Sequence, residues 1–195
     1  MRLVVGISGA SGSIYGIRLL QVLQGLKEVE THLIISDSAK QNIRLETDYT
    51  VASVEALANV RYQFKNVAAA IASGSFITMG MVIIPCSIHT LSCIAHSSNE
   101  NLLTRAADVT LKEHRRLVLV PRETPLHLGH LRLMTQVSEM GAILVPPMPA
   151  FYNRPRTLDD IIDQTVNRVL DLADIELPED LSERWTGPQP RWNEV

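Results

Sequence analysis

Short apolar runs alternate with longer amphipathic stretches along most of the chain, and this alternation limits the folds that the chain can adopt. Each run is nearly continuous in Val, Ile or Leu, which is typical of a parallel strand covered on both faces. The pattern predicts an α/β fold with a doubly wound parallel sheet, helices on both faces and right-handed crossovers. We expect strands at Leu3–Ile7, Thr31–Ile35, Met81–Ile84, Leu117–Val120 and Ala142–Val145.

Helical patterns separate the expected strands and follow the last one. We expect helices at Ser13–Leu26, Ser38–Glu46, Ser87–His96, Glu100–Arg115, His127–Met140 and Leu158–Ala173. The segment 47–78 is less regular. Residues 51–57 and 66–72 could form short helices, and residues 61–64 could form a strand or a loop.

The composition is that of an ordinary globular domain and excludes several classes of protein. The chain has 195 residues, of which 46% are hydrophobic, so one domain with a proper core is expected. A net charge of −3 argues against a nucleic-acid binder. We expect no signal peptide, and no apolar run approaches the ~20 residues of a membrane span. Cys86 and Cys93 lack a CxxC spacing, so we expect core thiols in a reducing, cytoplasmic protein.

Ligands of a doubly wound sheet bind beyond the carboxyl ends of its strands. Four of the five expected strands end in polar or charged residues next to Pro or Gly, which favours a ligand site at this edge, although turns favour the same residue types. The stretches concerned are GASG at 9–12, Ser36, PCSIHT at 85–90, PRE at 121–123 and PPMPAFYNRP at 146–155.

The GASG segment 9–12 leads directly into a helix. Its small side chains would let an anion reach backbone N–H groups at the positive end of that helix. The glycine spacing is not G-x-G-x-x-G, and the second strand ends at Ser36 rather than at an acid, so an NAD site is disfavoured. A phosphate or a flavin edge fits better. A simple tight turn with Ser11 or Ser13 as the helix cap remains open.

The PCSIHT motif allows two interpretations. Ser87 or Thr90 could cap the next helix, or the first amides of that helix could hold a ligand. His89 could contact a ligand, but a lone histidine here is more often a surface or capping residue.

Two pairs of charged residues could carry chemistry. Arg105 and Lys112 are seven residues apart, so they project from similar faces of a helix and could together hold a phosphate. Asp108 could instead pair with both of them. Arg122 and Glu123 follow a strand, where a cation can stabilise an anionic ring and a carboxylate can move protons.

Further candidates lie elsewhere in the chain. Glu46, at the end of a helix, is a second candidate carboxylate. Tyr152 lies in the rigid proline-rich loop, and Arg168 could reach a ligand phosphate or pair with neighbouring acids. His127 and His130 have i,i+3 spacing, but no carboxylate completes a metal motif, so we expect no metal site.

Six motifs that occur in order along the chain together resemble one family. They are GISGASGSIYGIRLL, SGSF at 73–76, IPCSIHTL, LLTRAADVTLKE, LVLVPRETPL and PPMPAFYNRP. Their combination is similar to that of the UbiX/Pad flavin prenyltransferases, from about residue 2 to Trp185. The resemblance implies a single FMN-binding, Rossmann-like (flavodoxin-like) domain at residues 1–185 and a C-terminal tail at 186–195.

The resemblance also implies a reaction and partners. Family members transfer a dimethylallyl group from dimethylallyl monophosphate to N5 and C6 of reduced FMN without a metal. The prenylated FMN serves a UbiD-type decarboxylase, and the ETPLHLGHLRLMTQ segment favours the ubiquinone pathway. The family usually forms dodecamers built from trimers, with the active site at subunit contacts.

Carried onto this chain, the resemblance implies three groups of site residues. The FMN contacts would be Gly9, Ala10, Ser11, Ser36, Ser87, Ile88, His89, Thr90 and Arg122. The prenyl phosphate would be surrounded by Ser73, Arg105, Lys112, Tyr152 and Arg168. The catalytic residues would be Glu46 and Glu123, as acid and base, and Lys112.

Two positions depart from the family pattern, and two rival functions remain open. Asp37 stands where many relatives have a basic residue, and His89 where they often have Lys or Gly, which puts in doubt the contacts around FMN. An FMN-dependent cysteine decarboxylase would share the fold but give the basic set no purpose. A non-catalytic FMN-binding protein would keep GASG and PCSIHT but need neither Glu46 nor Lys112.

Overall fold

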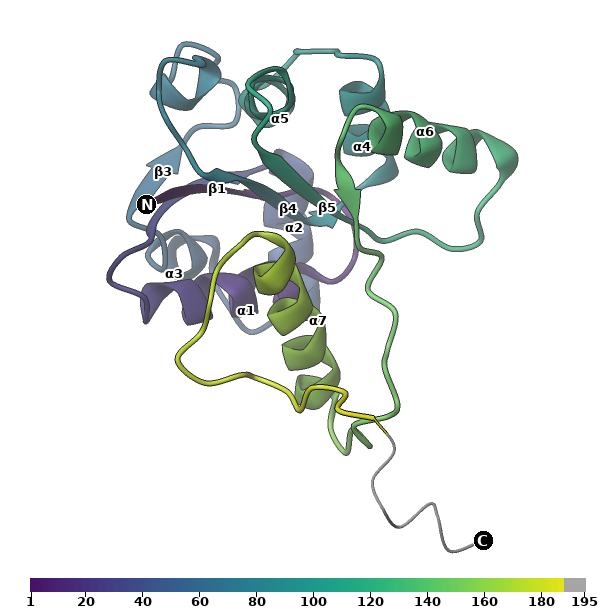
Figure 1. The fold of residues 1–195 in the computed structure, drawn as a ribbon. Coiled ribbons are helices and arrows are strands. Elements are labelled where there is room, and N and C mark those ends of the chain that lie inside the picture. Colours follow the sequence, from purple (N-terminus) through teal and green to yellow (C-terminus); the bar gives the residue numbers. More distant parts are fainter. Residues whose placement is uncertain (188–195) are drawn as a thin grey trace, which may run out of the picture.

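The computed structural model describes residues 1–187 and contains a six-stranded sheet in which every strand pairing is parallel (Figure 1). The spatial order of the strands is β3-β2-β1-β4-β5-β6. The predicted doubly wound α/β sheet is confirmed. The strands are β1 (Arg2–Ile7), β2 (Glu30–Ile35), β3 (Val60–Tyr62), β4 (Gly80–Cys86), β5 (Arg116–Pro121) and β6 (Ile143–Leu144).

Helices cover both faces of the sheet (Figure 1). One face packs against α1 (Ser13–Gln24), α2 (Asp37–Glu46), α3 (Val51–Glu55) and α7 (Leu158–Leu172). The other packs against the 3-10 turn η1 (Ala70–Ala72), α4 (Ile88–Ala95), α5 (Leu102–Lys112) and α6 (Leu128–Glu139). The sequence of strand β1 is continuously apolar because both faces of the strand are buried. Leu3 and Val5 join one buried cluster, and Val4 joins the other.

The strand order places the ligand-binding edge. Without the short edge strand β3, the order is second, first, third, fourth, fifth, which is that of flavodoxin. The chain winds outward in both directions from the β1/β4 boundary, and such a switch point opens a crevice at the carboxyl ends of the strands. Of the segment left open at 61–64, only the first two residues belong to a strand, Val60–Tyr62.

The differences from the expected elements lie at their ends. The helix expected at 100–115 is shorter, because the Asn101 side chain accepts a hydrogen bond from the Thr104 amide (3.0 Å) and His114 adopts a positive φ just beyond Lys112. Strand β6 has only two residues at the open edge of the sheet. The helix considered at 66–72 is a single 3-10 turn.

The sequence predicted no membrane span and two core thiols. No helix within residues 1–187 combines the length and the apolar character needed to cross a membrane. Cys86 and Cys93 are both free and buried, and burial raises the pKa of each thiol. Most of the expected tail at 186–195, including Trp192, lies outside the described residues.

Gly16 fixes how closely α1 approaches the sheet. A Cβ at Gly16 would lie 2.4 Å from the Ile84 carbonyl oxygen and 3.0 Å from Ile7 Cδ1. We expect Gly16→Ala to lower the free energy of unfolding by about 1–3 kcal/mol, measured by urea denaturation, because the helix must move off the strand. Gly25→Ala is the matched control, since its Cβ would meet only the Val22 carbonyl, at 3.3 Å, and φ is −74°. Equal losses in the two variants would contradict this interpretation.

Candidate active site

Three helices begin at neighbouring points of the carboxyl edge. Helices α1, α2 and α4 follow β1, β2 and β4, which are adjacent in the sheet. The Ser36 hydroxyl caps α2 by accepting from the Ala39 amide (3.1 Å), and the Ser87 hydroxyl caps α4 by accepting from the Thr90 amide (3.2 Å). The three helix ends concentrate partial positive charge at one place, which suits an anionic ligand.

The GASG loop is braced from α2. Gly12, at φ +98°, is the N-cap of α1 and provides no side-chain hydrogen bond, so neither Ser11 nor Ser13 caps the helix. Glu46 Oε2 instead accepts from the amides of Gly12 (2.9 Å) and Ser13 (3.1 Å). The predicted catalytic Glu46 therefore lies at the start of α1, beside the residues expected to contact FMN.

Asn42 is a second brace, and the sequence reasoning missed it. Its Nδ2 donates to the Ala10 carbonyl oxygen at 3.0 Å. The available signal was its spacing, because Asn42 precedes Glu46 by four residues and so shares a helix face with it. Together the two side chains hold the loop at Ala10 and at Gly12.

Ser8 joins the first and third loops of this edge and was also missed. It is buried, its hydroxyl donates to the Pro85 carbonyl (3.1 Å), and the Ser87 amide donates to the same hydroxyl (2.8 Å). A hydroxyl at the buried end of an apolar strand was the signal that could have identified it. The hydrogen bonds fix the GASG and PCSIHT segments relative to each other.

Arg122 and Glu123 lie at the same edge, beyond β5. The Arg122 amide donates to the Cys86 carbonyl (3.2 Å). Burial raises the pKa of the Tyr15 phenol, and the positive charge of Arg122 partly offsets that rise. Glu123 is exposed, and its carboxylate accepts from the Thr124 amide (3.1 Å). His89 is exposed on the first turn of α4. The residues expected to bind FMN therefore share one edge of the sheet with both candidate acid–base residues.

Ser73, Arg105 and Lys112 come together at the opposite, amino edge. Arg105 Nε donates to the carbonyl of Ala72 (3.1 Å), next to Ser73. A Cβ on Gly74 would lie 2.9 Å from Lys112 Nζ, so the ammonium group lies against the same loop. Asp108 pairs with Arg105 (3.0 Å), whereas Lys112 pairs with Glu113, so the exposed ladder considered for these charges forms only in part.

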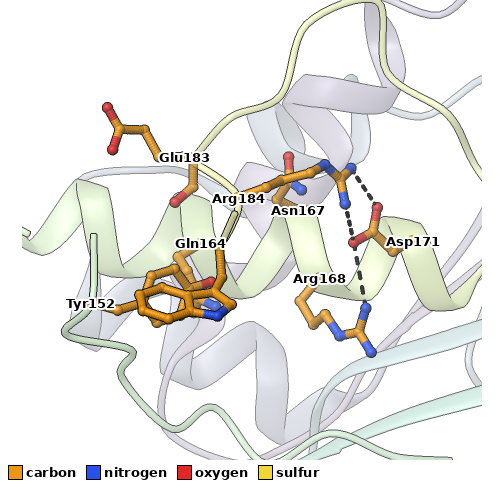
Figure 2. Close-up of a pocket in the computed structure, with 9 residues that line it drawn as sticks. Tyr152, Gln164, Asn167, Arg168, Asp171, Glu183 and Arg184 are labelled. Carbon is orange, nitrogen blue, oxygen red and sulfur yellow. Dashed lines mark hydrogen bonds and ion pairs between the residues drawn. The ribbon is translucent and has the colours of Figure 1, made fainter. Parts of the chain in front are cut away.

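Tyr152 and Arg168 form a third group, on the outer side of α7 (Figure 2). They line a pocket of about 300 Å³ together with Trp185. The ring of Tyr152 meets that of Trp185 edge to face, with centroids 5.6 Å apart. Arg168 is exposed and lies 3.6 Å from an oxygen of Asp171, so it pairs with an acid while remaining open to solvent.

The chain segment over this pocket is held by Arg184. Its guanidinium donates to both oxygens of Asp171 (3.0 and 2.8 Å) and of Asp180 (2.6 Å each). These hydrogen bonds lower the pKa of Asp180. Asn167 Oδ1 accepts from the Leu181 amide (2.8 Å) and fixes the start of the same segment. Trp185 is thereby placed against Tyr152.

A single chain does not bring these three groups into one site. The six residues of β5 separate Lys112 from Glu123, which is roughly 20 Å along a strand. Arg168 lies on α7, which packs on α1 through the Arg18–Asp163 ion pair (2.6 Å), on the face of the sheet opposite to α5.

His127 caps a helix, and its ring lies against that of His130. His127 Nδ1 accepts from the Gly129 amide (3.0 Å) at the start of α6, and the two imidazole rings are tilted at 33° with centroids 3.6 Å apart. Within residues 1–187, no three His, Cys, Asp or Glu side chains are grouped so that they could hold a metal ion.

Comparison with known proteins identifies the family of this chain. A model of the Flavoprotein family matches residues 1–170. The family match and the fold thus define a flavoprotein. The chain is 64% identical over 186 residues to the protein named Flavin prenyltransferase UbiX of Escherichia coli K12. The aligned region covers 95% of this chain and 98% of that protein. The chain belongs to the UbiX family of flavin prenyltransferases.

Two solved structures superpose closely on this one. A dodecameric FMN-dependent UbiX-like decarboxylase from Escherichia coli O157:H7 matches with a TM-score of 0.92 and 50% identity, over 96% of this chain and 100% of that one. AnUbiX (PadA1), in complex with FMN and dimethylallyl pyrophosphate, matches with a TM-score of 0.92 and 46% identity, over 96% and 98%. The peptidyl-cysteine decarboxylase EpiD, at 15% identity and a TM-score of 0.62, shares only the fold.

The Glu46 brace predicts a measurable loss of stability. Glu46→Ala removes the acceptor of the Gly12 and Ser13 amides, so we expect the free energy of unfolding to fall by about 1 kcal/mol, as for a lost helix cap. Urea denaturation measures the change. Gln41→Ala, at an exposed position of the same helix, should cost less. A Glu46→Ala protein as stable as the Gln41→Ala protein would show that the carboxylate does not cap α1.

The Arg184 clamp predicts a change in the surroundings of Trp185. In a Trp192→Phe background, which leaves Trp185 as the remaining tryptophan, we expect Arg184→Gln to increase quenching of the emission by acrylamide, because the segment loses both ion pairs. Glu183→Gln is the control, since its side chain makes no hydrogen bond within residues 1–187. Unchanged quenching in Arg184→Gln would contradict the clamp.

Proposed function

We propose that this chain transfers a dimethylallyl group from dimethylallyl monophosphate to N5 and C6 of reduced FMN and releases prenylated FMN and phosphate. The observation that carries the proposal is the 64% identity, over 95% of the chain, to a protein named flavin prenyltransferase. The candidate residues agree with the reaction. It needs a flavin site, cations for the departing phosphate and a group that removes a proton, and the chain has a candidate for each.

The donor groups of the carboxyl edge fit FMN. Three helix N-termini, the hydroxyls of Ser36 and Ser87 and the Arg122 guanidinium are offered at one edge, and the Ser13 hydroxyl is buried without a hydrogen-bond partner in the described chain. We propose that this edge holds FMN through Gly9, Ala10, Ser11, Ser36, Ser87, Ile88, His89, Thr90 and Arg122. When bound there, FMN supplies the nucleophilic positions of the reaction.

The basic residues fit a departing phosphate. We propose that Ser73, Arg105, Lys112, Tyr152 and Arg168 surround the prenyl phosphate. Breakage of the allylic C–O bond leaves its electron pair on the phosphate, and nearby guanidinium and ammonium groups stabilise that charge. The proton displaced when the new carbon–carbon bond forms needs a carboxylate acceptor, which we assign to Glu46 or Glu123.

The proposed site requires more than one copy of the chain. Lys112 and Glu123 lie at opposite edges of the sheet, and Arg168 lies on the face away from α5. We propose a homo-oligomer, such as the dodecamer that the related E. coli structure forms, in which neighbouring copies supply the missing groups.

The product also has a proposed destination. Prenylated FMN is a modified cofactor, so a second protein must take it up, and we propose a UbiD-type decarboxylase. The UbiX relative and the ETPLHLGHLRLMTQ segment favour ubiquinone synthesis as the pathway.

A direct assay tests the function. The purified oligomer is incubated with reduced FMN and dimethylallyl monophosphate without magnesium, and the flavin is weighed by mass spectrometry. We expect a flavin heavier by one five-carbon unit. No adduct with either the monophosphate or the pyrophosphate would overturn the proposed function.

Two variants test the assigned roles. We expect Lys112→Ala and Glu123→Gln to keep the FMN affinity and lose at least about 100-fold in turnover, because each removes a group that acts on charge or proton transfer. Glu139→Gln, on α6, is the control with expected normal turnover. A fully active Lys112→Ala or Glu123→Gln protein would refute that residue's role.

A further inference from the structure

In the loop 72–78, which carries Ser73, the carbonyls of Ala72, Gly74 and Phe76 accept hydrogen bonds from arginine side chains. The side chain of Arg115 reaches it from the end of the α5–β5 connection and is only 14% exposed. Its Nη2 donates to the Gly74 carbonyl (2.7 Å), and its Nη1 donates to the Phe76 carbonyl (3.0 Å) and lies 3.4 Å from the Thr78 hydroxyl. One guanidinium thus contacts every second residue of the loop from 74 to 78.

Glu113 connects this anchor to Lys112. One oxygen of its carboxylate pairs with Lys112 Nζ, and the other lies 3.9 Å from Arg115 Nη2. The hydrogen bond from Lys112 lowers the pKa of Glu113, with a smaller contribution from Arg115. Gly74 makes the close contact feasible, because a Cβ there would lie 2.1 Å from Glu113 Oε1.

Within this loop, Phe76 packs against the core and Thr78 is buried, whereas the side chains of Ser73 and Ser75 are exposed. The hydroxyls of Ser73 and Ser75 are 2.9 Å apart on exposed residues, beside the Lys112 ammonium. Arg105 holds the preceding carbonyl, that of Ala72, from the other side. An anion that approaches this surface would meet hydroxyls and an ammonium whose positions depend on the largely covered Arg115 guanidinium.

We propose that Arg115 is a positioning residue for phosphate recognition: by binding the Gly74 and Phe76 carbonyls and the Glu113 carboxylate, it holds Ser73 and Lys112 in the geometry that binds the phosphate group of the prenyl donor. The inference deepens the proposed function and rests on it for the identity of the donor. Arg115 does not itself touch the ligand. A lysine there would keep the charge but offer no fork for two carbonyls.

The experiment compares Arg115→Lys with wild type in the assembled, FMN-loaded protein. Inorganic phosphate is the probe, and calorimetry measures its Kd. We expect the Kd of phosphate and the KM for dimethylallyl monophosphate to rise about tenfold, the effect of roughly one charged hydrogen bond, while the Kd of FMN stays unchanged. Hydrogen exchange of the amides in 73–78 should quicken in the variant.

Arg116→Lys is the matched control. This neighbouring guanidinium contacts the Leu172 carbonyl (3.2 Å) and Asp174 (3.2 Å) rather than the loop, so phosphate binding should remain normal. If Arg115→Lys does not assemble, Thr78→Val and Glu113→Gln remove single contacts of the same network and should weaken phosphate binding in the same direction.

The possible outcomes separate the inference from the proposed function. Unchanged phosphate affinity and unchanged loop exchange in Arg115→Lys would overturn the inference, as would equal losses of phosphate and FMN affinity, which indicate a general structural role. A wild-type protein that does not bind phosphate would overturn it as well. Weakened phosphate binding in the variant, together with a wild type that forms no flavin adduct, would support the anchoring role while the proposed function fails.

Discussion

The parallel pairing of β1, β2 and β4 is the constraint on which the rest of the molecule depends. Because these strands point the same way, each must be followed by a crossover, and the helices of those crossovers begin at one edge of the sheet. The same polarity sends the ends of the returning helices to the other edge. The distribution of charge in this protein follows from that geometry, with helix N-termini at the carboxyl edge and the Arg105, Lys112 and Arg115 group at the amino edge.

The two edges use polar groups in different ways. At the carboxyl edge, side chains of α2 hold the first loop by its amides and a carbonyl, through Glu46 and Asn42. At the amino edge, the guanidinium groups of Arg105 and Arg115 bind loop carbonyls. A loop without regular structure must satisfy its backbone groups in some way, and here long side chains from helix α5 and its connection do so. The hydroxyls of the loop are then left for other contacts.

The sequence was sufficient for the sheet because burial on both faces requires continuous apolar strands, and each of the five expected strands exists. It was insufficient for β3 and for the ends of α5, where a three-residue pairing or one capping side chain decides the boundary. For the site, motifs located the loops but not their braces. Asn42, Ser8 and Arg115 act through backbone groups of residues 32 to 79 positions away, and no local pattern encodes such contacts.

The separation of Lys112 from Glu123 within one subunit has a genetic consequence. If each proposed site draws these residues from different copies, a chain defective in Lys112 still offers an intact carboxyl edge, and a chain defective in Glu123 still offers an intact amino edge. Mixed oligomers of the two defective chains then contain some sites in which both residues are present. Two alleles that are each inactive alone would complement one another in the same cell, whereas two defects at the same edge would not.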